Sequence, residues 1–434
     1  MSPQTAPRSE PIRLSAWLGW SAAIVIVVAA SWCMPLFSSQ DPTKGTLRYP
    51  PLYPVYFQSN LDAPLEMETC LGFPEYYRKQ PYRISRPTYY AALAVVRNAV
   101  FRPLASLILG PPAKNWGPWP ARDHIATYFI WLLANLVCLL VAVRMAYSLV
   151  ASRLPPSVAR LSALMLLTTP IVLLALREIH LNDYQIFTGM ASLVFWSSLL
   201  SGRLAGRLAL LASMGLGLAL LGKPSLNLFG AGVGICLLLG QGRKLLTVLP
   251  AVALPYLLWL GAIKAMGLKY ALPEVTEWHS GVWIFEMGVA AVARESIWYA
   301  GQWISVLGES LTPVHLAAAA LGAYVLWTRK ESVPSGDTGT IHPTGRSLLV
   351  LIAYIAACDF SFYFLVHRVH AVYYVGTLLG LYSLTAVGLF RMLDSAAGRL
   401  NLPLAAAARE RVVLAAVIGM QVALAIRQLP RYPG

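Results

Sequence analysis

The feature that most constrains this chain is a series of apolar runs, most of them close to 20 residues long. An α-helix needs about 20 apolar residues to cross the hydrocarbon core of a bilayer. Charged residues make up only 12% of the chain, whereas soluble domains average about 25%. The sequence therefore predicts an all-α polytopic membrane protein, one domain over residues 1–434 with about eleven transmembrane helices. The expected helices lie near residues 14–37, 125–149, 158–177, 185–201, 207–222, 226–240, 245–263, 311–328, 347–366, 371–390 and 411–427.

The positions of lysine and arginine predict which side of the membrane each loop faces. Arg8 and Arg13 precede the first apolar run, which has no small-residue cleavage pattern before Pro35, so we expect a retained signal anchor with a cytoplasmic N-terminus. The basic residues of the later loops then gather on the cytoplasmic side, as the positive-inside rule requires. The expected inner loops carry Arg153, Arg160, Arg203, Arg207, Arg243, Lys244, Arg329, Lys330, Arg346, Arg391, Arg399, Arg409 and Arg411. The C-terminal tail, with Arg427 and Arg431, fits this orientation less well.

Two long segments are expected on the outer side, 38–124 and 264–310. The first contains an apolar stretch, 89–110, that is interrupted by arginines and by Pro103. If this stretch crossed the membrane, every later loop would change sides, so we expect a helix that lies along the interface. The second segment holds four tryptophans, a residue that favours the headgroup layer. We therefore expect both segments to be the outer loop regions of the domain.

The net charge of +15 does not indicate a nucleic-acid partner. Most of the lysines and arginines flank apolar runs, where they orient helices and contact the phosphates of membrane lipids. The cysteines show no CxxC pattern and no metal-ligand spacing. In HRVH, His367 and His370 at i, i+3 could ligate a divalent metal beside Arg368, but no partner cluster is evident, so no metal site is predicted.

The first outer segment carries an acidic group followed by a basic, tyrosine-rich stretch. Asp62 and its acidic neighbours lie in SNLDAPLEMETC, and Tyr82, Arg83 and Arg86 lie in YYRKQPYRISRPTYY, residues 76–90. Guanidinium groups bind phosphate oxygens in a bidentate manner, and tyrosine offers a flat face with a hydroxyl. The pattern suits a lipid phosphate headgroup. The alternatives are a solvated acidic loop and a basic patch that meets only bulk anionic lipid.

Further polar groups stand at expected outer ends of helices. REIHLNDYQ brings His180 and Asp183 into a short turn, and Lys223 lies in LGKPSLN, where Pro224 breaks the helix. The lysine could cap the helix end or point at an anion in a cavity, and the turn could be polar only because it is exposed. Asp359 lies inside an apolar run, where an ionisable group is costly and often functional.

This layout resembles the GT-C superfamily of membrane glycosyltransferases, and most closely its protein-mannosyltransferase and aminoarabinose-transferase branch. The similar features are the two long outer segments, Asp62 before PYRISRP, Asp183 in the second outer turn, and the Lys-Pro break in LGKPS. The chain departs from the family in one respect. Family members often place an acidic catalytic residue soon after the first helix, and here Asp41 is nearer to that helix, whereas Asp62 better fits the spacing to the arginine stretch.

The resemblance implies transfer of a sugar from a polyprenyl-phosphate donor to a lipid, glycan or protein acceptor at the outer face of the plasma membrane, in bacteria the inner membrane. Asp62 would be the general base, and Asp183 with His180 would orient a substrate. Arg83, Arg86 and Lys223 would neutralise the phosphate, and Tyr82, His367 and Arg368 would contribute to binding. Membrane lipids are the other expected partners. No cofactor is predicted, although the resemblance is compatible with a divalent metal.

Two rival functions stay open at this point. A transporter or flippase for a lipid-linked or anionic substrate would account for Asp359 and the broken helices, and a non-catalytic scaffold would leave the charged clusters without a task. The transferase hypothesis requires Asp62, Asp183, Arg86 and Lys223 to converge on one outward-facing cavity. A transporter would instead place its key groups near the middle of the membrane.

Overall fold

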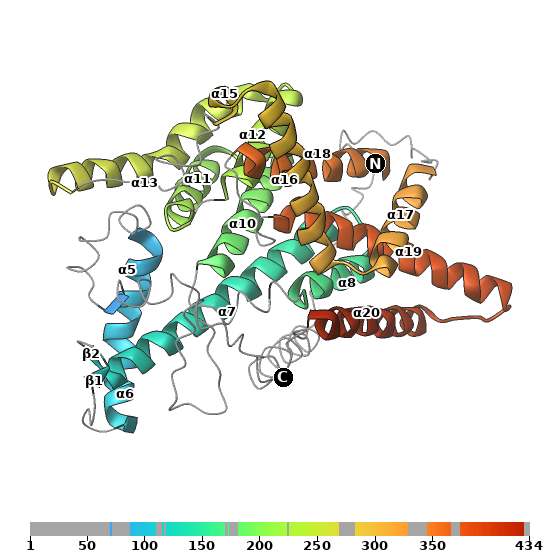
Figure 1. Ribbon diagram of the computed structural model, residues 1–434, viewed down its shortest axis with the longest axis horizontal. Coiled ribbons are helices and arrows are strands. Elements are labelled where there is room, and N and C mark those ends of the chain that lie inside the picture. The colour runs from blue at the N-terminus through green and yellow to red at the C-terminus, as the bar shows by residue number, and fades with distance from the viewer. Residues whose placement is uncertain are drawn as a thin grey trace, which may run out of the picture.

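The computed structural model of the 434-residue chain is almost entirely helical (Figure 1). It describes residues 70–71, 87–109, 115–116, 119–169, 172, 181–223, 225–268, 283–328, 345–365 and 374–428. A single antiparallel pair of two-residue strands, β1 (Asn115–Trp116) and β2 (Trp119–Pro120), interrupts the helices of this part of the chain. The prediction of an all-α fold is therefore confirmed.

The helices follow one another with short connections over most of the described chain. In chain order they are α5 (Pro87–Val96), the π-helix η3 (Arg97–Phe101), α6 (Arg102–Leu109), α7 (Ala121–Ala151), α8 (Pro156–Leu167), α10 (Asn182–Leu200), α11 (Gly206–Leu220), α12 (Leu226–Leu238), the 3-10 helix η4 (Gly242–Lys244), α13 (Leu245–Ala265), α15 (Trp283–Glu286), α16 (Val289–Ser310), α17 (Pro313–Thr328), α18 (Gly345–Leu365), α19 (Val375–Arg399) and α20 (Ala406–Gln428). Every apolar run predicted beyond residue 124 overlaps one of these helices. The first run, 14–37, lies outside the described residues.

Four helical spans in the described chain are long and apolar enough to cross a membrane: 129–151 of α7, 242–265 of η4 and α13, and the whole of α18 and of α19. Helices α16 and α17 together would make a fifth, although they are bent by 99° at the break between them. Helices α8, α11 and α12 are apolar but have only 12, 15 and 13 residues. The described part of the chain thus supports a membrane protein, with up to five spans by length and composition, and does not confirm the eleven that were predicted.

Helix α16 was not predicted from the sequence, which indicated a long outer segment over 264–310. Arg294, Glu295 and Gln302 interrupt its apolar pattern, so it does not read as a membrane-spanning run. Its tryptophans do not share one environment either. Trp298 is half exposed, whereas the ring of Trp303 packs edge-on against Phe360 of α18. Helix α16 contacts α18 and α20. Its place in the fold therefore reflects tertiary packing and not a continuous apolar pattern.

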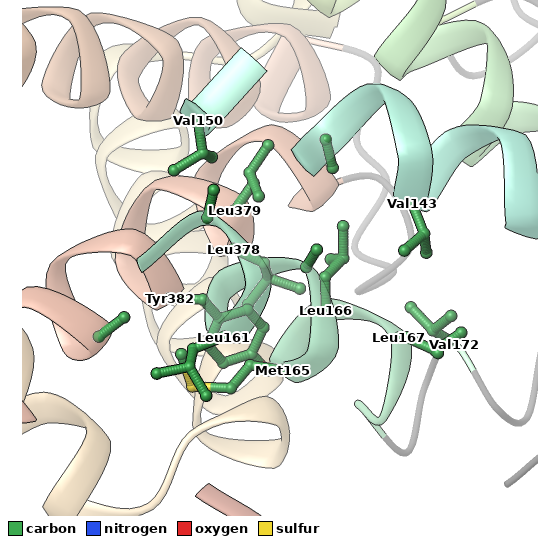
Figure 2. Close-up of a cluster of buried hydrophobic side chains, with 14 of the residues drawn as sticks. Val143, Val150, Leu161, Met165, Leu166, Leu167, Val172, Leu378, Leu379 and Tyr382 are labelled. Atoms are coloured by element: carbon green, nitrogen blue, oxygen red, sulfur yellow. The ribbon is translucent and has the colours of Figure 1, made fainter. Parts of the chain in front are cut away.

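The main apolar core lies where α8 is enclosed by α7 and α19 (Figure 2). Leu161 and Met165 of α8 pack with Leu378 and Tyr382 of α19, and Val143 of α7 joins the same cluster. Many leucines outside the core are exposed, which is the arrangement expected where lipid replaces water around a protein. The most exposed include Leu211, Leu237, Leu238, Leu246, Leu257 and Leu258.

Helices α17 and α19 approach each other closely through glycines. A Cβ atom added to Gly322 would collide with the backbone oxygen of Leu384, and one added to Gly388 would collide with that of Ala318. Small residues at a helix crossing allow this backbone approach, which drives helix association in membranes. The crossing therefore depends on both glycines.

Helices α5, η3 and α6 form a continuous helical stretch across the N-terminal end of α7 (Figure 1). Buried Arg97 donates to the backbone oxygens of Cys70 (2.7 Å) and Leu71 (3.3 Å), and Arg102 pairs with Asp123 of α7 at 3.2 Å. Burial lowers the pKa of Arg97, although an arginine remains charged at neutral pH. The pair between Arg102 and Asp123 joins the stretch to α7, and its predicted position along the membrane interface stays a prediction.

Candidate functional site

Five helix ends that are distant in the sequence meet in one polar region. The start of α10, the end of α11, the start of α12, the end of α18 and the start of α19 are joined by side-chain hydrogen bonds. The polar side chains involved are buried, although most of the surrounding helices are apolar. In the topology predicted from the basic loops, all five ends face the outer side. We call this region the polar helix-end site.

Lys223 and Asp183, two residues predicted for the site, both belong to it. Lys223 lies between α11 and α12, is buried, and donates from Nζ to Oδ1 of Asn182 at 3.1 Å. Asn182 and Asp183 are the first two residues of α10, and Asp183 is fully buried. A carboxylate in the first turn is favoured by the helix dipole, and the N-cap residue Leu181 provides no side-chain cap. The structure therefore brings the ammonium group to the residue adjacent to Asp183.

The connection between α11 and α12 is fastened to α10 by short polar contacts. The hydroxyl of Thr188 donates to the backbone oxygen of Lys223 (2.9 Å), and that of Ser225 donates to the backbone oxygen of Gln185 (2.9 Å). The hydroxyl of Tyr184 donates to the backbone oxygen of Ala219 at 2.8 Å. The bond from Thr188 satisfies the carbonyl of Lys223 at the interruption of the helix, and the other two bonds join the ends of α11 and α12 to α10. They also hold Lys223 in place.

Asp359 accepts hydrogen bonds from the first turn of the neighbouring helix α19. Its Oδ2 accepts the backbone N–H (3.1 Å) and the hydroxyl (2.7 Å) of Thr377, in the first turn of α19, and its Oδ1 accepts Nδ2 of Asn227 (2.7 Å). The N-cap residue of α19, Tyr374, makes no side-chain cap. A carboxylate is well suited to this position because the N-terminus of a helix carries partial positive charge. Both oxygens of Asp359 are thus engaged in linking α18, α19 and α12.

A chain of neutral side chains extends from Asp359 to α10. Tyr363 of α18 donates its hydroxyl proton to Oδ1 of Asn227 at 3.3 Å. Gln185 of α10 donates from Nε2 to the same hydroxyl at 3.2 Å. The three helices that carry these residues are therefore joined by polar contacts at the level of the site.

An aromatic wall borders the chain. The hydroxyls of Tyr299 (α16) and Tyr374 form a hydrogen bond of 2.7 Å, and the rings of Tyr363 and Tyr374 lie edge to face with 5.6 Å between centroids. Phe360 contacts the ring of Tyr299. Edge-to-face packing of this kind holds rings in fixed positions. Helix α16 thereby contributes to the boundary of the site.

The helical stretch of the first long segment reaches the opposite border. The hydroxyl of Tyr89 in α5 donates to Oδ1 of Asn135 in α7 at 2.9 Å. Its ring lies 4.8 Å from that of Tyr184, one residue after Asp183. The tyrosine-rich stretch predicted to bind a headgroup therefore ends beside α10.

The remaining predicted site residues lie outside the described part of the chain. These are Asp62, Tyr82, Arg83, Arg86, His180, His367 and Arg368. The predicted convergence of Asp62 and an arginine on Asp183 consequently stays a prediction. Among the described residues, no group of three or more His, Cys, Asp and Glu side chains could hold a metal ion.

The sequence did not single out four residues of the site: Gln185, Asn227, Tyr363 and Thr377. They are neutral and fall inside or beside apolar runs, so neither charge nor spacing marks them. Only their hydrogen bonds to Asp359 and to one another identify them. No family model, curated protein or solved structure matches this chain.

Proposed function

We propose that this chain is a membrane glycosyltransferase that moves a sugar from a polyprenyl-phosphate donor to a lipid, glycan or protein acceptor. The observation that carries the proposal is the burial of Lys223 against Asn182, the residue that precedes the buried Asp183 in α10. An ammonium and a carboxylate are costly to bury next to lipid, so their occurrence together indicates a functional site. Glycosyl transfer from a phosphate-linked donor uses groups of both kinds, a carboxylate as base and a cation for the leaving phosphate.

The phosphate end of the donor would bind near Lys223. The N-termini of α10 and α12 flank this lysine, and neither is capped by the side chain of its N-cap residue. Helix N-termini carry partial positive charge and favour phosphate. Lys223, together with the predicted Arg83 and Arg86, would stabilise the negative charge that develops on the leaving phosphate.

A carboxylate would activate the acceptor. Asp359 is poorly suited, because both its oxygens already accept hydrogen bonds. Asp62 is the base that the family resemblance suggests, and Asp183 is the described carboxylate next to Lys223. The base takes the proton of the acceptor hydroxyl, whose oxygen attacks the anomeric carbon. The bond from that carbon to the phosphate oxygen breaks, and polyprenyl phosphate leaves with the electron pair, so the anomeric configuration inverts.

The proposal includes a location and an orientation. About eleven spans with a cytoplasmic N-terminus would place the polar helix-end site at the outer face of a plasma membrane, in bacteria the inner membrane. Segments 38–124 and 264–310 would then cover the site from outside. A lipid-linked donor reaches this position within the bilayer, and the same lipids surround the exposed leucines.

One observation favours a second candidate, a transporter or flippase. The break between α16 and α17 lies next to buried polar residues, with Thr312 bonded to His315 at 2.8 Å and Tyr382 bonded to the backbone oxygen of Ser310 at 2.8 Å. Broken helices with polar groups are typical of transporter binding sites. Asp359, which also favoured a transporter, has both oxygens engaged in hydrogen bonds between helices and supports this function less.

A reconstituted system distinguishes the two functions. The purified full-length protein is incubated in nanodiscs with radiolabelled polyprenyl-phosphate sugars and a membrane-lipid extract as acceptor, and in liposomes with a fluorescent polyprenyl phosphate. A transferase moves label to the acceptor without needing two compartments. Translocation of the fluorescent lipid without any transfer of label would support the transporter and contradict the proposal.

A further inference from the structure

The donors of the chain between Asp359 and Gln185 all point toward the carboxylate. Asp359 accepts from Nδ2 of Asn227, Asn227 accepts at Oδ1 from the hydroxyl of Tyr363, and Tyr363 accepts from Nε2 of Gln185. The chain thus begins at a charged acceptor and ends at a neutral amide on α10. Its direction has a chemical cause.

The orientation of each amide follows from the groups it meets. A carboxylate can only accept, so Asn227 must turn its Nδ2 toward Asp359 and its Oδ1 toward Tyr363. The hydroxyl of Tyr363 has one proton, which it gives to Asn227, so it receives its hydrogen bond from an N–H of Gln185. The assignment of the two amides is therefore fixed by hydrogen-bond chemistry rather than by their shape.

This orientation turns Oε1 of Gln185 away from Tyr363. The side chain of Gln185 is only 4% exposed, and its Oε1 has no hydrogen-bond partner in the described part of the chain. A buried acceptor without a donor is costly, and such atoms in folded proteins usually have a reason. Gln185 follows Asp183 by two residues, and its backbone oxygen binds Ser225, two residues after Lys223. The open acceptor is therefore part of the polar helix-end site.

The surroundings restrict the ligand group that can bind this oxygen. The group must be a donor, which excludes a phosphate oxygen without a proton. Lys223, whose Nζ binds Asn182 three residues before Gln185 in α10, disfavours a cation, since like charges repel strongly in a medium of low dielectric constant. A neutral hydroxyl meets both conditions, and a sugar carries several.

We propose that Gln185 accepts a hydrogen bond from a hydroxyl of the transferred sugar, and that Asp359 acts as a positioning residue through Asn227 and Tyr363. The inference rests on the proposed function, because it takes the bound molecule to be a sugar linked to a lipid phosphate. It assigns the phosphate and the sugar of the donor to different residues of the site. Lys223 binds the phosphate, and Gln185 binds the sugar.

Equilibrium binding to the full-length protein in nanodiscs tests this division. The probes are bare polyprenyl phosphate and a panel of radiolabelled polyprenyl-phosphate pentoses and hexoses. Gln185→Leu should raise the Kd of the best-bound sugar-carrying lipid about five- to tenfold, as expected for one uncharged hydrogen bond, and leave that of the bare lipid unchanged. Tyr363→Phe should act in the same direction, because it frees the amide of Gln185 to rotate. Gln421→Leu, at a buried glutamine of α20 outside the site, should change neither Kd.

The outcomes separate the two proposals. Suppose that the wild-type protein binds the sugar-carrying lipid. If Gln185→Leu then raises the Kd of both lipids equally, or of neither, the role of Gln185 is overturned while the proposed function stands. If the wild-type protein binds no polyprenyl phosphate of either kind, both proposals are overturned. Should Gln185→Leu fail to fold, the ratio of the two Kd values in Tyr363→Phe decides in the same way.

Discussion

The carboxylate of Asp359 in α18 caps the first turn of α19 by accepting both the backbone N–H and the hydroxyl of Thr377, at 3.1 and 2.7 Å. An intramembrane aspartate usually indicates a substrate or ion pathway. Here its contacts assign it to the assembly of three helices, α12, α18 and α19. The charge therefore has a structural task that sequence inspection could not distinguish from a functional one.

This capping predicts a large loss of stability when Asp359 is removed. Asp359→Ala deprives a backbone N–H, a hydroxyl and an amide of their acceptor, and hydrogen bonds to charged groups contribute about 1.5–3 kcal/mol each. We expect a loss of roughly 3 kcal/mol or more, measured as a lower apparent Tm in detergent. Asp394→Ala, at a half-exposed aspartate paired with Arg409, should lower the Tm far less. Equal effects of the two changes would contradict the capping role.

An ion pair between α8 and α20 should contribute modestly. Arg160 binds Glu410 through two bonds of 2.7 Å, with both side chains about one-third exposed. Exposed pairs contribute about 0.2–1 kcal/mol, and a bidentate arginine belongs at the upper end of that range. A double-mutant cycle with Arg160→Met and Glu410→Gln should give a coupling energy of this size that decreases with added salt. A coupling of zero at low salt would show that the pair does not hold α20.

The crossing of α17 and α19 should tolerate no side chain at Gly322. Gly322→Leu places atoms where the backbone of Leu384 lies, so the two helices must separate and lose their close packing. We expect a lower apparent Tm and reduced protein yield. Gly301→Leu, at a glycine of α16 whose Cβ would meet no atom within 4 Å, is the matched control. An unchanged Tm for Gly322→Leu would contradict the close crossing.

The predicted orientation can be tested in intact cells. Single cysteines at Arg203 and Lys330 should react with a membrane-impermeant maleimide only after the membrane is permeabilised. A cysteine at Asp62 should react without permeabilisation, because the segment 38–124 is expected outside. Native cysteines are replaced beforehand. External labelling at Arg203 would reverse the orientation of the whole chain.

Sequence reasoning predicted helices well where the apolar pattern was long and continuous, as in α7, α18 and α19. It failed for α16, because Arg294 and Gln302, which interrupt the apolar pattern of this helix, are exposed residues of a helix that packs against α18 and α20. It also singled out Asp183 and Lys223 from their positions at expected outer helix ends, and both are buried in the polar helix-end site. The neutral members Gln185, Asn227 and Tyr363 could not be predicted, because a hydrogen-bonded chain between distant helices leaves no periodic or charged signature in the sequence.

The most direct test of the account is single-turnover transfer by the reconstituted protein in which Asp183 or Lys223 is replaced. The wild-type protein should move radiolabel from a polyprenyl-phosphate sugar to the acceptor extract. Asp183→Asn and Asp62→Asn identify the base by comparison, since loss of a general base costs about 100- to 10,000-fold in rate. Lys223→Met should slow transfer through loss of phosphate stabilisation, and Lys244→Met, at a lysine bonded to the backbone oxygen of Leu199 away from the site, should leave transfer unchanged. Wild-type rates in both Asp183→Asn and Lys223→Met would show that the polar helix-end site does not carry the reaction.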